Sequence, residues 1–205
     1  MNKINKKLFI LISIFLLSTL FASIVLAEDT NENITFTGKG DDVIEVKILG
    51  EKNFFLMKII GNKQKKHFAV TGYDENNNKT ELYVNTTDPY EGLRPVYEKT
   101  KILEINASGE WEIILKPIEQ ITVVEVPGKI EGSGDYIFKL EDDVMKAGIV
   151  GNDKENHFAV MIYDENFNRL DIAVNTTDKY EGAIMIPNEG IFIEVIASGN
   201  WSIEF

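Results

Sequence analysis

Hydrophobic and polar residues alternate with a period of two along most of the chain after residue 30. Positions 44–48, 111–115 and 201–205 each place apolar side chains on every second residue. No segment after residue 30 carries the apolar stripe of an amphipathic helix. Segments rich in Asn, Asp, Gly and Pro separate the alternating runs at intervals of about 8–12 residues. This pattern predicts an all-β protein of short strands, arranged as an antiparallel β-sandwich of the jelly-roll type.

The chain contains an internal repeat. A shift of 90 residues aligns Gly61–Gly92 with Gly151–Gly182 without a gap, and 19 of the 32 positions are identical. Upstream of these segments, Gly38–Asp41 aligns with Gly132–Asp135 if the first copy has four additional residues, which we place around residues 49–53. This identity indicates a duplication, and each copy is long enough to form a small domain with its own core.

The repeat predicts two tandem β-sandwich domains, at residues 28–117 and 118–205. Pro117 and Pro127 mark the junction because proline interrupts strand pairing. The apolar, β-branched segment Ile118–Val126 is predicted to form the first strand of the second copy. Such a short junction predicts domains that touch.

Each copy has the same order of features. In the second copy, a Gly-Asp pair opens an alternating strand (Gly134–Leu140), a strand leads into an acidic turn (Val160–Asn166), and a hairpin closes the repeat (Pro187–Val195 with Ser198–Ile203). This order resembles the prepeptidase C-terminal (PPC-like) β-sandwich modules of secreted bacterial and archaeal proteins. The resemblance implies a non-catalytic accessory domain that accompanies a secreted enzyme, although no catalytic domain is recognisable in this chain.

The first 27 residues have the features of a signal peptide. Three lysines at positions 3, 6 and 7 precede the apolar stretch Leu8–Phe21, and Val25 and Ala27 supply small residues at −3 and −1 of a cleavage site. The alternative is an uncleaved membrane anchor, since Leu8–Ala27 is close to the roughly 20 residues that span a bilayer. Both interpretations place the rest of the chain outside the cytoplasm, either secreted or associated with the cell surface.

Charge and cysteine content narrow the range of functions. There is no cysteine, so the exported part has no disulfide and no Cys-ligated metal. Without its first 27 residues the chain has 18 basic and 33 acidic residues, a net charge of −15. This charge repels nucleic acids and anionic lipid surfaces, so nucleic-acid binding is excluded.

Two loops have the oxygen-ligand spacing that opens an EF-hand, Asp74-x-Asn76-x-Asn78 and Asp164-x-Asn166-x-Asn168. In both loops a basic residue replaces the glycine of the sixth position, and an asparagine replaces the bidentate glutamate of the twelfth. A hairpin turn is therefore favoured, because Asn and Asp tolerate positive φ and bond to their own backbone. Weak calcium binding by Asp74, Asn76, Asp164 and Asn166 is the alternative.

The remaining polar motifs are weaker. Asn85 and Asn175 begin Asn-Thr-Thr glycosylation sequons and are candidate glycosylation sites. His67 and His157, the only histidines, occupy equivalent positions, and neither has a His, Cys or Asp two residues away that would help to make a zinc site. Solvent-facing strand residues are the favoured interpretation of both.

No catalytic set is present. The chain has no Gly-x-Ser-x-Gly elbow, and its paired acids lie in predicted turns. We therefore expect an exported, non-catalytic binding or structural module without cofactors. Its expected partner is a cell-envelope polysaccharide or a surface protein, and its candidate sugar contacts are the aromatic residues Tyr73, Tyr83, Tyr90 and Tyr180. The alternative is a secreted hydrolase or an enzyme inhibitor with an unrecognised site, and a third possibility is a self-assembling envelope component.

Overall fold

The computed structural model describes residues 32–46, 54–97 and 99–205. The predicted signal peptide and the predicted four-residue insertion lie outside these residues. The described part is all-β, apart from one short 3₁₀ helix, η1 (Ile118–Gln120). It contains no helix that is long and apolar enough to cross a membrane. The predicted all-β class is confirmed.

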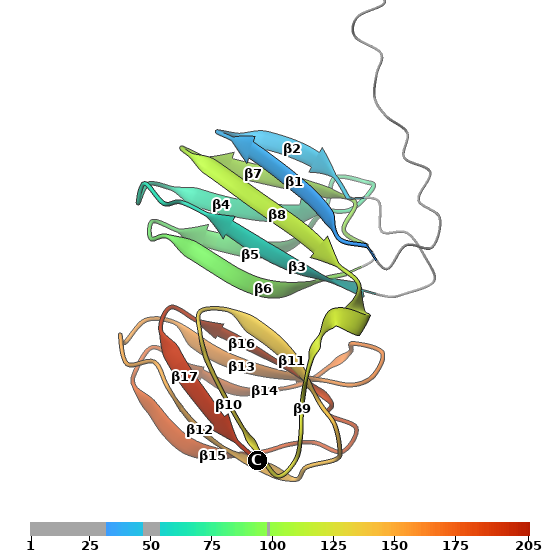
Figure 1. The fold of residues 1–205 in the computed structure, drawn as a ribbon, viewed down its shortest axis with the longest axis vertical. Coiled ribbons are helices and arrows are strands. Elements are labelled where there is room, and N and C mark those ends of the chain that lie inside the picture. Colours follow the sequence, from blue (N-terminus) through green and yellow to red (C-terminus); the bar gives the residue numbers. More distant parts are fainter. Residues whose placement is uncertain (1–31, 47–53, 98) are drawn as a thin grey trace, which may run out of the picture. The chain divides into compact units, whose positions relative to one another are not determined.

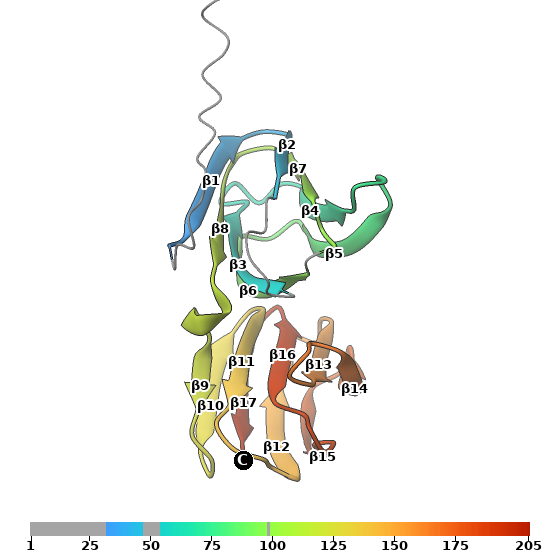
Figure 2. The same cartoon turned by 90° about the vertical axis from the view of Figure 1, so that its right-hand side faces the viewer.

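The first half of the described chain, residues 32–116, consists of two antiparallel sheets (Figure 1). In strand order, one sheet is β1 (Ile34–Lys39), β8 (Glu110–Lys116), β3 (Phe54–Gly61) and β6 (Tyr90–Tyr97), and the other is β2 (Asp42–Glu45), β7 (Ile102–Ala107), β4 (Phe68–Tyr73) and β5 (Lys79–Thr86). The two sheets lie opposite each other around a core (Figure 2), and β8 alternates between buried and more exposed positions, as expected for a sheet with one face on a core. β4 departs from this alternation, because five of its six residues are buried.

The second half repeats this topology with one added strand. Its sheets, in strand order, are β10 (Lys129–Ser133), β17 (Asn200–Glu204), β12 (Lys146–Gly151) and β15 (Tyr180–Met185), and β14 (Arg169–Thr176), β13 (Phe158–Tyr163), β16 (Phe192–Ala197), β11 (Tyr136–Leu140) and β9 (Thr122–Val124). Except for β9, each strand of the second half occupies the place of its counterpart in the first. The duplication therefore extends to the pairing of the strands.

The segment between the halves differs from its prediction. Residues 118–120 form η1 instead of a strand. Pro117, the residue before η1, has no N–H to donate to a neighbouring strand, so strand pairing is interrupted there. Only Thr122–Val124 is extended, as β9, and it pairs with β11 in parallel, so the sheets are not purely antiparallel. The parallel pairing follows from the chain path, because β10 in the opposite sheet separates β9 from β11.

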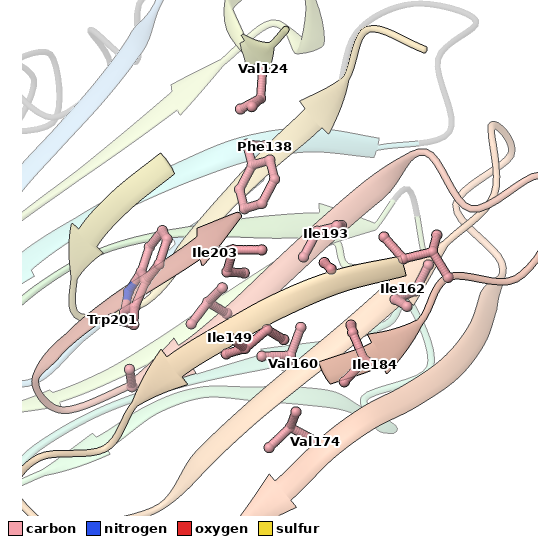
Figure 3. Packing of buried hydrophobic residues seen from close by; sticks show 14 of the residues in the cluster. Val124, Phe138, Ile149, Val160, Ile162, Val174, Ile184, Ile193, Trp201 and Ile203 are labelled. Atoms are coloured by element: carbon pink, nitrogen blue, oxygen red, sulfur yellow. The ribbon is translucent and has the colours of Figure 1, made fainter. Parts of the chain in front are cut away.

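Each half has its own apolar core. In the second half the core fills the space between the two sheets, with Phe138, Val160, Ile193 and Trp201 among the buried side chains (Figure 3). Trp201 donates its indole N–H to the backbone oxygen of Gly134 at 2.9 Å, and Trp111 makes the same bond to Gly40 at 3.0 Å in the first half. These two bonds anchor the last strand of each half.

Glycine is required beneath both tryptophans. A β-carbon at Gly38 would lie 2.2 Å from the ring of Trp111, and one at Gly132 would lie 2.3 Å from the ring of Trp201. No side chain fits at such distances, so the indole packs flat on bare backbone. The shared Gly and Trp positions of the two repeats are therefore explained by packing.

A third apolar cluster contains residues of both halves. It includes Leu56 from β3 together with Ile137, Met161, Tyr163 and Phe192 from the sheet of β11, β13 and β16. The described residues accordingly belong to one compact unit. The domain boundaries at residues 28–117 and 118–205 stay a prediction.

Candidate functional site

The two loops with EF-hand-like spacing are hairpin turns, the interpretation that the sequence favours. Asp74 lies between β4 and β5, and its Oδ1 accepts hydrogen bonds from the backbone N–H groups of Asn76 (2.9 Å) and Asn78 (2.8 Å). Its Oδ2 accepts one from the Asn78 side chain at 3.0 Å. The loop at Asp164 makes the same three bonds. These bonds lower the pKa of Asp74, and both carboxylates are thus engaged within their own turns.

The other predicted positions lie on the surface. Asn85 and Asn175 are exposed near the ends of β5 and β14, as the glycosylation prediction requires, and their modification stays a prediction. His67 and His157 are both exposed, and the Nε2 of His157 lies 3.2 Å from Oδ1 of Asn175. Among the described residues, no group of three or more His, Asp or Glu side chains could hold a metal ion.

The tyrosine candidates differ in their environments. Tyr83 is buried, and its hydroxyl lies 3.1 Å from that of Thr100, so it offers no face to a sugar. Tyr180 packs beside Phe158 in the second core. Tyr73 is half-buried and bonds to Glu104. Of these four hydroxyls, that of Tyr90 belongs to a larger polar assembly.

That assembly is a buried charge network between the two halves. Arg94 projects from β6, which is an edge strand, and its Nε donates to Oε1 of Glu194 on β16 at 2.6 Å. Its Nη1 donates to the backbone oxygen of Tyr83 at 2.9 Å and reaches Oδ2 of Asp135 at 3.4 Å. Only 6%, 1% and 6% of the surfaces of Arg94, Glu194 and Asp135 are exposed.

Tyrosine hydroxyls and backbone amides complete the network. Tyr90 donates its hydroxyl to Oδ2 of Asp135, and Tyr163 donates to Oε2 of Glu194, both at 2.6 Å. Asp135 also accepts the backbone N–H of Ala197 at Oδ1, and its backbone oxygen accepts the N–H of Leu93. No buried side-chain N or O atom of the described residues lacks a partner. The cost of burying three charges is therefore offset by a full set of bonds.

Burial and neighbouring charges together shift the pKa values of the groups in this network. Burial alone would lower the pKa of the Arg94 guanidinium, but the carboxylates of Glu194 and Asp135 outweigh burial and raise it. Burial raises the pKa of Tyr90 and Tyr163 well above the ordinary value, reinforced chiefly by the Asp135 carboxylate at Tyr90 and by the Glu194 carboxylate at Tyr163. Burial also raises the pKa of Tyr97 to about 12. The phenols therefore remain hydrogen-bond donors at neutral pH, and the network is suited to holding the halves together.

A polar groove runs beside this network. Its volume is about 1230 Å³, and both halves contribute to its walls. Tyr90, Arg94 and Asp135 lie among the lining residues, which connects the groove to the buried charges. Ammonium, amide, hydroxyl and carboxylate groups surround them, from residues that include Lys65, Asp88, Gln120, Thr122, Ser133, Lys154, Asn156 and His157.

The sequence contained a signal for this site, in the positions where the repeats differ. Arg94 aligns with Ile184 and has no counterpart in the second half, whereas Glu194 aligns with Glu104. The arginine occurs in one copy only, whereas the glutamate occurs in both. Such a difference indicates an ion pair that only one of the two glutamates forms. The position of the groove could not be read from sequence, because it depends on how the halves pack.

Comparisons with known proteins add the following. No family model matches the chain, and no curated protein matches its sequence. Among solved structures, it is similar to a protein of an archaeal virus with a triple jelly-roll fold and turret assembly (11% identity, 80% of this chain, 51% of that chain, TM-score 0.32). It is also similar to the exported protein XepA of PBSX (13% identity, 84% of this chain, 83% of that chain, TM-score 0.27).

A third similar structure is the regulatory subunit of a cAMP-independent protein kinase A from Trypanosoma cruzi bound to guanosine (10% identity, 84% of this chain, 71% of that chain, TM-score 0.23). The chain spans about half the length of the archaeal virus protein. At these identities and TM-scores the likenesses carry no conclusion about function, so the site must be interpreted from its own chemistry.

Proposed function

We propose that the chain is an exported, non-catalytic binding module that holds a polar polymer of the cell surface, such as a polysaccharide, in the groove between its halves. The observation that carries this proposal is the composition of the groove wall. Hydroxyl, amide and ammonium groups from both halves face one space of about 1230 Å³. Such groups form the directional hydrogen bonds that orient a polar ligand.

The network beneath the groove supports the proposal. Arg94, Asp135 and Tyr90 line the groove and are also tied to one another, so the two walls are fixed before a ligand arrives. A preformed groove binds with a smaller loss of conformational entropy than a flexible one. Tyr136 contributes a half-buried aromatic ring beside the Thr122 hydroxyl, a pairing that suits the apolar face and polar rim of a sugar.

The PPC-like resemblance and the predicted export are consistent with this role, and both remain proposals. A surface polymer repeats its binding units, so a chain retained at the envelope would gain avidity from many weak groove contacts. The groove lies between the halves and not within one of them, which suits an extended ligand better than a small substrate.

A glycan array combined with binding to isolated envelope fractions tests the proposal. We expect the unaltered chain to bind at least one polysaccharide class, and His157→Ala together with Lys65→Glu to weaken that binding. The matched control is His67→Ala together with Lys63→Glu, because these residues are also exposed but do not line the groove. Absence of binding to every glycan and envelope fraction, or equal losses in both double variants, would overturn the proposal.

A further inference from the structure

The two surfaces that meet between the halves each have an equivalent surface elsewhere in the molecule, and both equivalents are exposed. In the second half, Ile137 and Glu194 are paired across β11 and β16, and both are buried by the first half. In the first half the same pair is Val43 and Glu104 on β2 and β7. Val43 is 63% exposed, whereas Ile137 is 0% exposed. The first half thus keeps an open copy of the face that the second half has covered.

The open face retains the polar chemistry of the covered one. Tyr73 donates its hydroxyl to Oε2 of Glu104 at 2.8 Å, as Tyr163 does to Glu194 at 2.6 Å. The covered glutamate also binds Arg94, but among the described residues no lysine or arginine forms a salt bridge with Glu104. An oriented carboxylate on a partly apolar face is therefore left without a cation.

The second half keeps an open copy of the opposite surface. Leu56 and Pro95 pair across β3 and β6 and are buried at the junction of the halves. Their counterparts are Lys146 and Met185, which pair across β12 and β15. Met185 is 70% exposed, and Lys146 is exposed beside it. This edge therefore presents an apolar side chain and a cation together.

We propose that these two open surfaces bind each other between molecules, so that the chain associates head to tail. The edge around Lys146 and Met185 of one molecule docks on the face around Val43, Tyr73 and Glu104 of a second copy, which repeats the contact that joins the halves. The Lys146 ammonium supplies the cation for Glu104, and Met185 covers Val43. Because the two surfaces differ, each molecule keeps one of them free for a further copy, which produces rings or open chains.

The residues of the open surfaces also set the strength of this contact. Polar residues replace the apolar ones of the covered face at three positions, since Met161, Phe167 and Ile196 correspond to Thr71, Asn77 and Asn106. The open edge also has Ile184 at the position that corresponds to Arg94. Less apolar area and a surface ion pair give weaker association than the interface within the chain. The assembly is therefore reversible and depends on protein concentration.

Sedimentation velocity over a range of protein concentrations tests the proposal. The unaltered chain is expected to shift from monomer to larger species as its concentration rises. Val43→Glu and Met185→Glu should each weaken association by roughly tenfold or more, since each places a charge in the contact. Val123→Glu, on a 54% exposed strand residue outside both surfaces, is the control and should associate normally.

Mixing the variants identifies the geometry. Val43→Glu leaves the edge intact and Met185→Glu leaves the face intact, so an equimolar mixture should form one-to-one dimers that grow no further. Exchange of the charges provides a second readout: Glu104→Lys and Lys146→Glu should each weaken association, and their combination should restore it. A chain that stays monomeric at all concentrations, or association unaffected by these changes, would overturn the proposal.

Discussion

The two equivalent sheet faces of this molecule share a tyrosine and a glutamate, but one face is buried and the other is exposed. On the second half, Tyr163 and Glu194 lie beneath the first half, where Arg94 binds the glutamate. On the first half, Tyr73 and Glu104 make the same hydrogen bond in contact with solvent. The first half covers one pair, and solvent contacts the other. Burial makes the same hydrogen bond part of a buried network.

This comparison shows how a duplicated surface becomes asymmetric. One copy of the edge has an arginine where the other has an isoleucine, and one copy of the face has apolar residues where the other has polar ones. A buried carboxylate without a cation costs much more than an exposed one. Equivalent substitutions in the two halves should therefore have very different effects at the shared interface and similar effects elsewhere.

The largest effect is expected from removal of the cation. Arg94→Ala leaves Glu194 and Asp135 buried without their partner, which should lower the free energy of unfolding by about 3–5 kcal/mol. Chemical denaturation monitored by tryptophan fluorescence measures this loss. Arg169→Ala, at the exposed start of β14, is the control and should change stability by less than about 0.5 kcal/mol. Equal losses would show that the network does not hold the halves together.

The next effect concerns the apolar pair at the centre of the two faces. Ile137→Ala removes a fully buried side chain and should cost about 2–5 kcal/mol. Val43→Ala, at the equivalent and 63% exposed position, should change stability by less than about 0.5 kcal/mol at concentrations low enough to keep the chain monomeric. A large loss from Val43→Ala would mean that the first face is covered within the monomer.

Stability at alkaline pH depends on how strongly the fold resists ionisation of its buried tyrosines. Burial raises the pKa of Tyr163 and Tyr97, the latter to about 12, so the folded state resists ionisation that the unfolded chain undergoes near pH 10. This stability is complete below pH 10 and is lost as the pH rises toward the folded pKa values. Each buried tyrosine adds up to ~1.4 kcal/mol per pH unit to the decline.

Replacement of single tyrosines separates the two faces. Tyr163→Phe removes a buried group with a strongly raised pKa and should flatten the decline in stability between pH 10 and pH 12. The pKa of Tyr73 is also raised, chiefly by its hydrogen bond to Glu104, but its exposure makes the effect of Tyr73→Phe smaller. Denaturation at several alkaline pH values measures both, and identical slopes would contradict the difference in burial.

The sequence predicted the elements of the fold better than its interfaces. Period-two alternation and the repeat identified the all-β class, and turn chemistry identified the hairpins at Asp74 and Asp164, because these features depend on neighbouring residues. The buried state of Tyr83 and the role of Arg94 depend on which surfaces meet, and local patterns carry no such information. The helical turn at Ile118–Gln120 was missed because its β-branched neighbours favour a strand.

The smallest effect is expected where the halves are alike. The loops at Asp74 and Asp164 make the same three hydrogen bonds, so Asp74→Ala and Asp164→Ala should each lower the melting temperature slightly and to a similar extent. Because the carboxylates already serve their own turns, we expect the loss to be the same in calcium and in EDTA. If calcium stabilised the unaltered chain more than either variant, these aspartates would be calcium ligands and the turn would be only their scaffold.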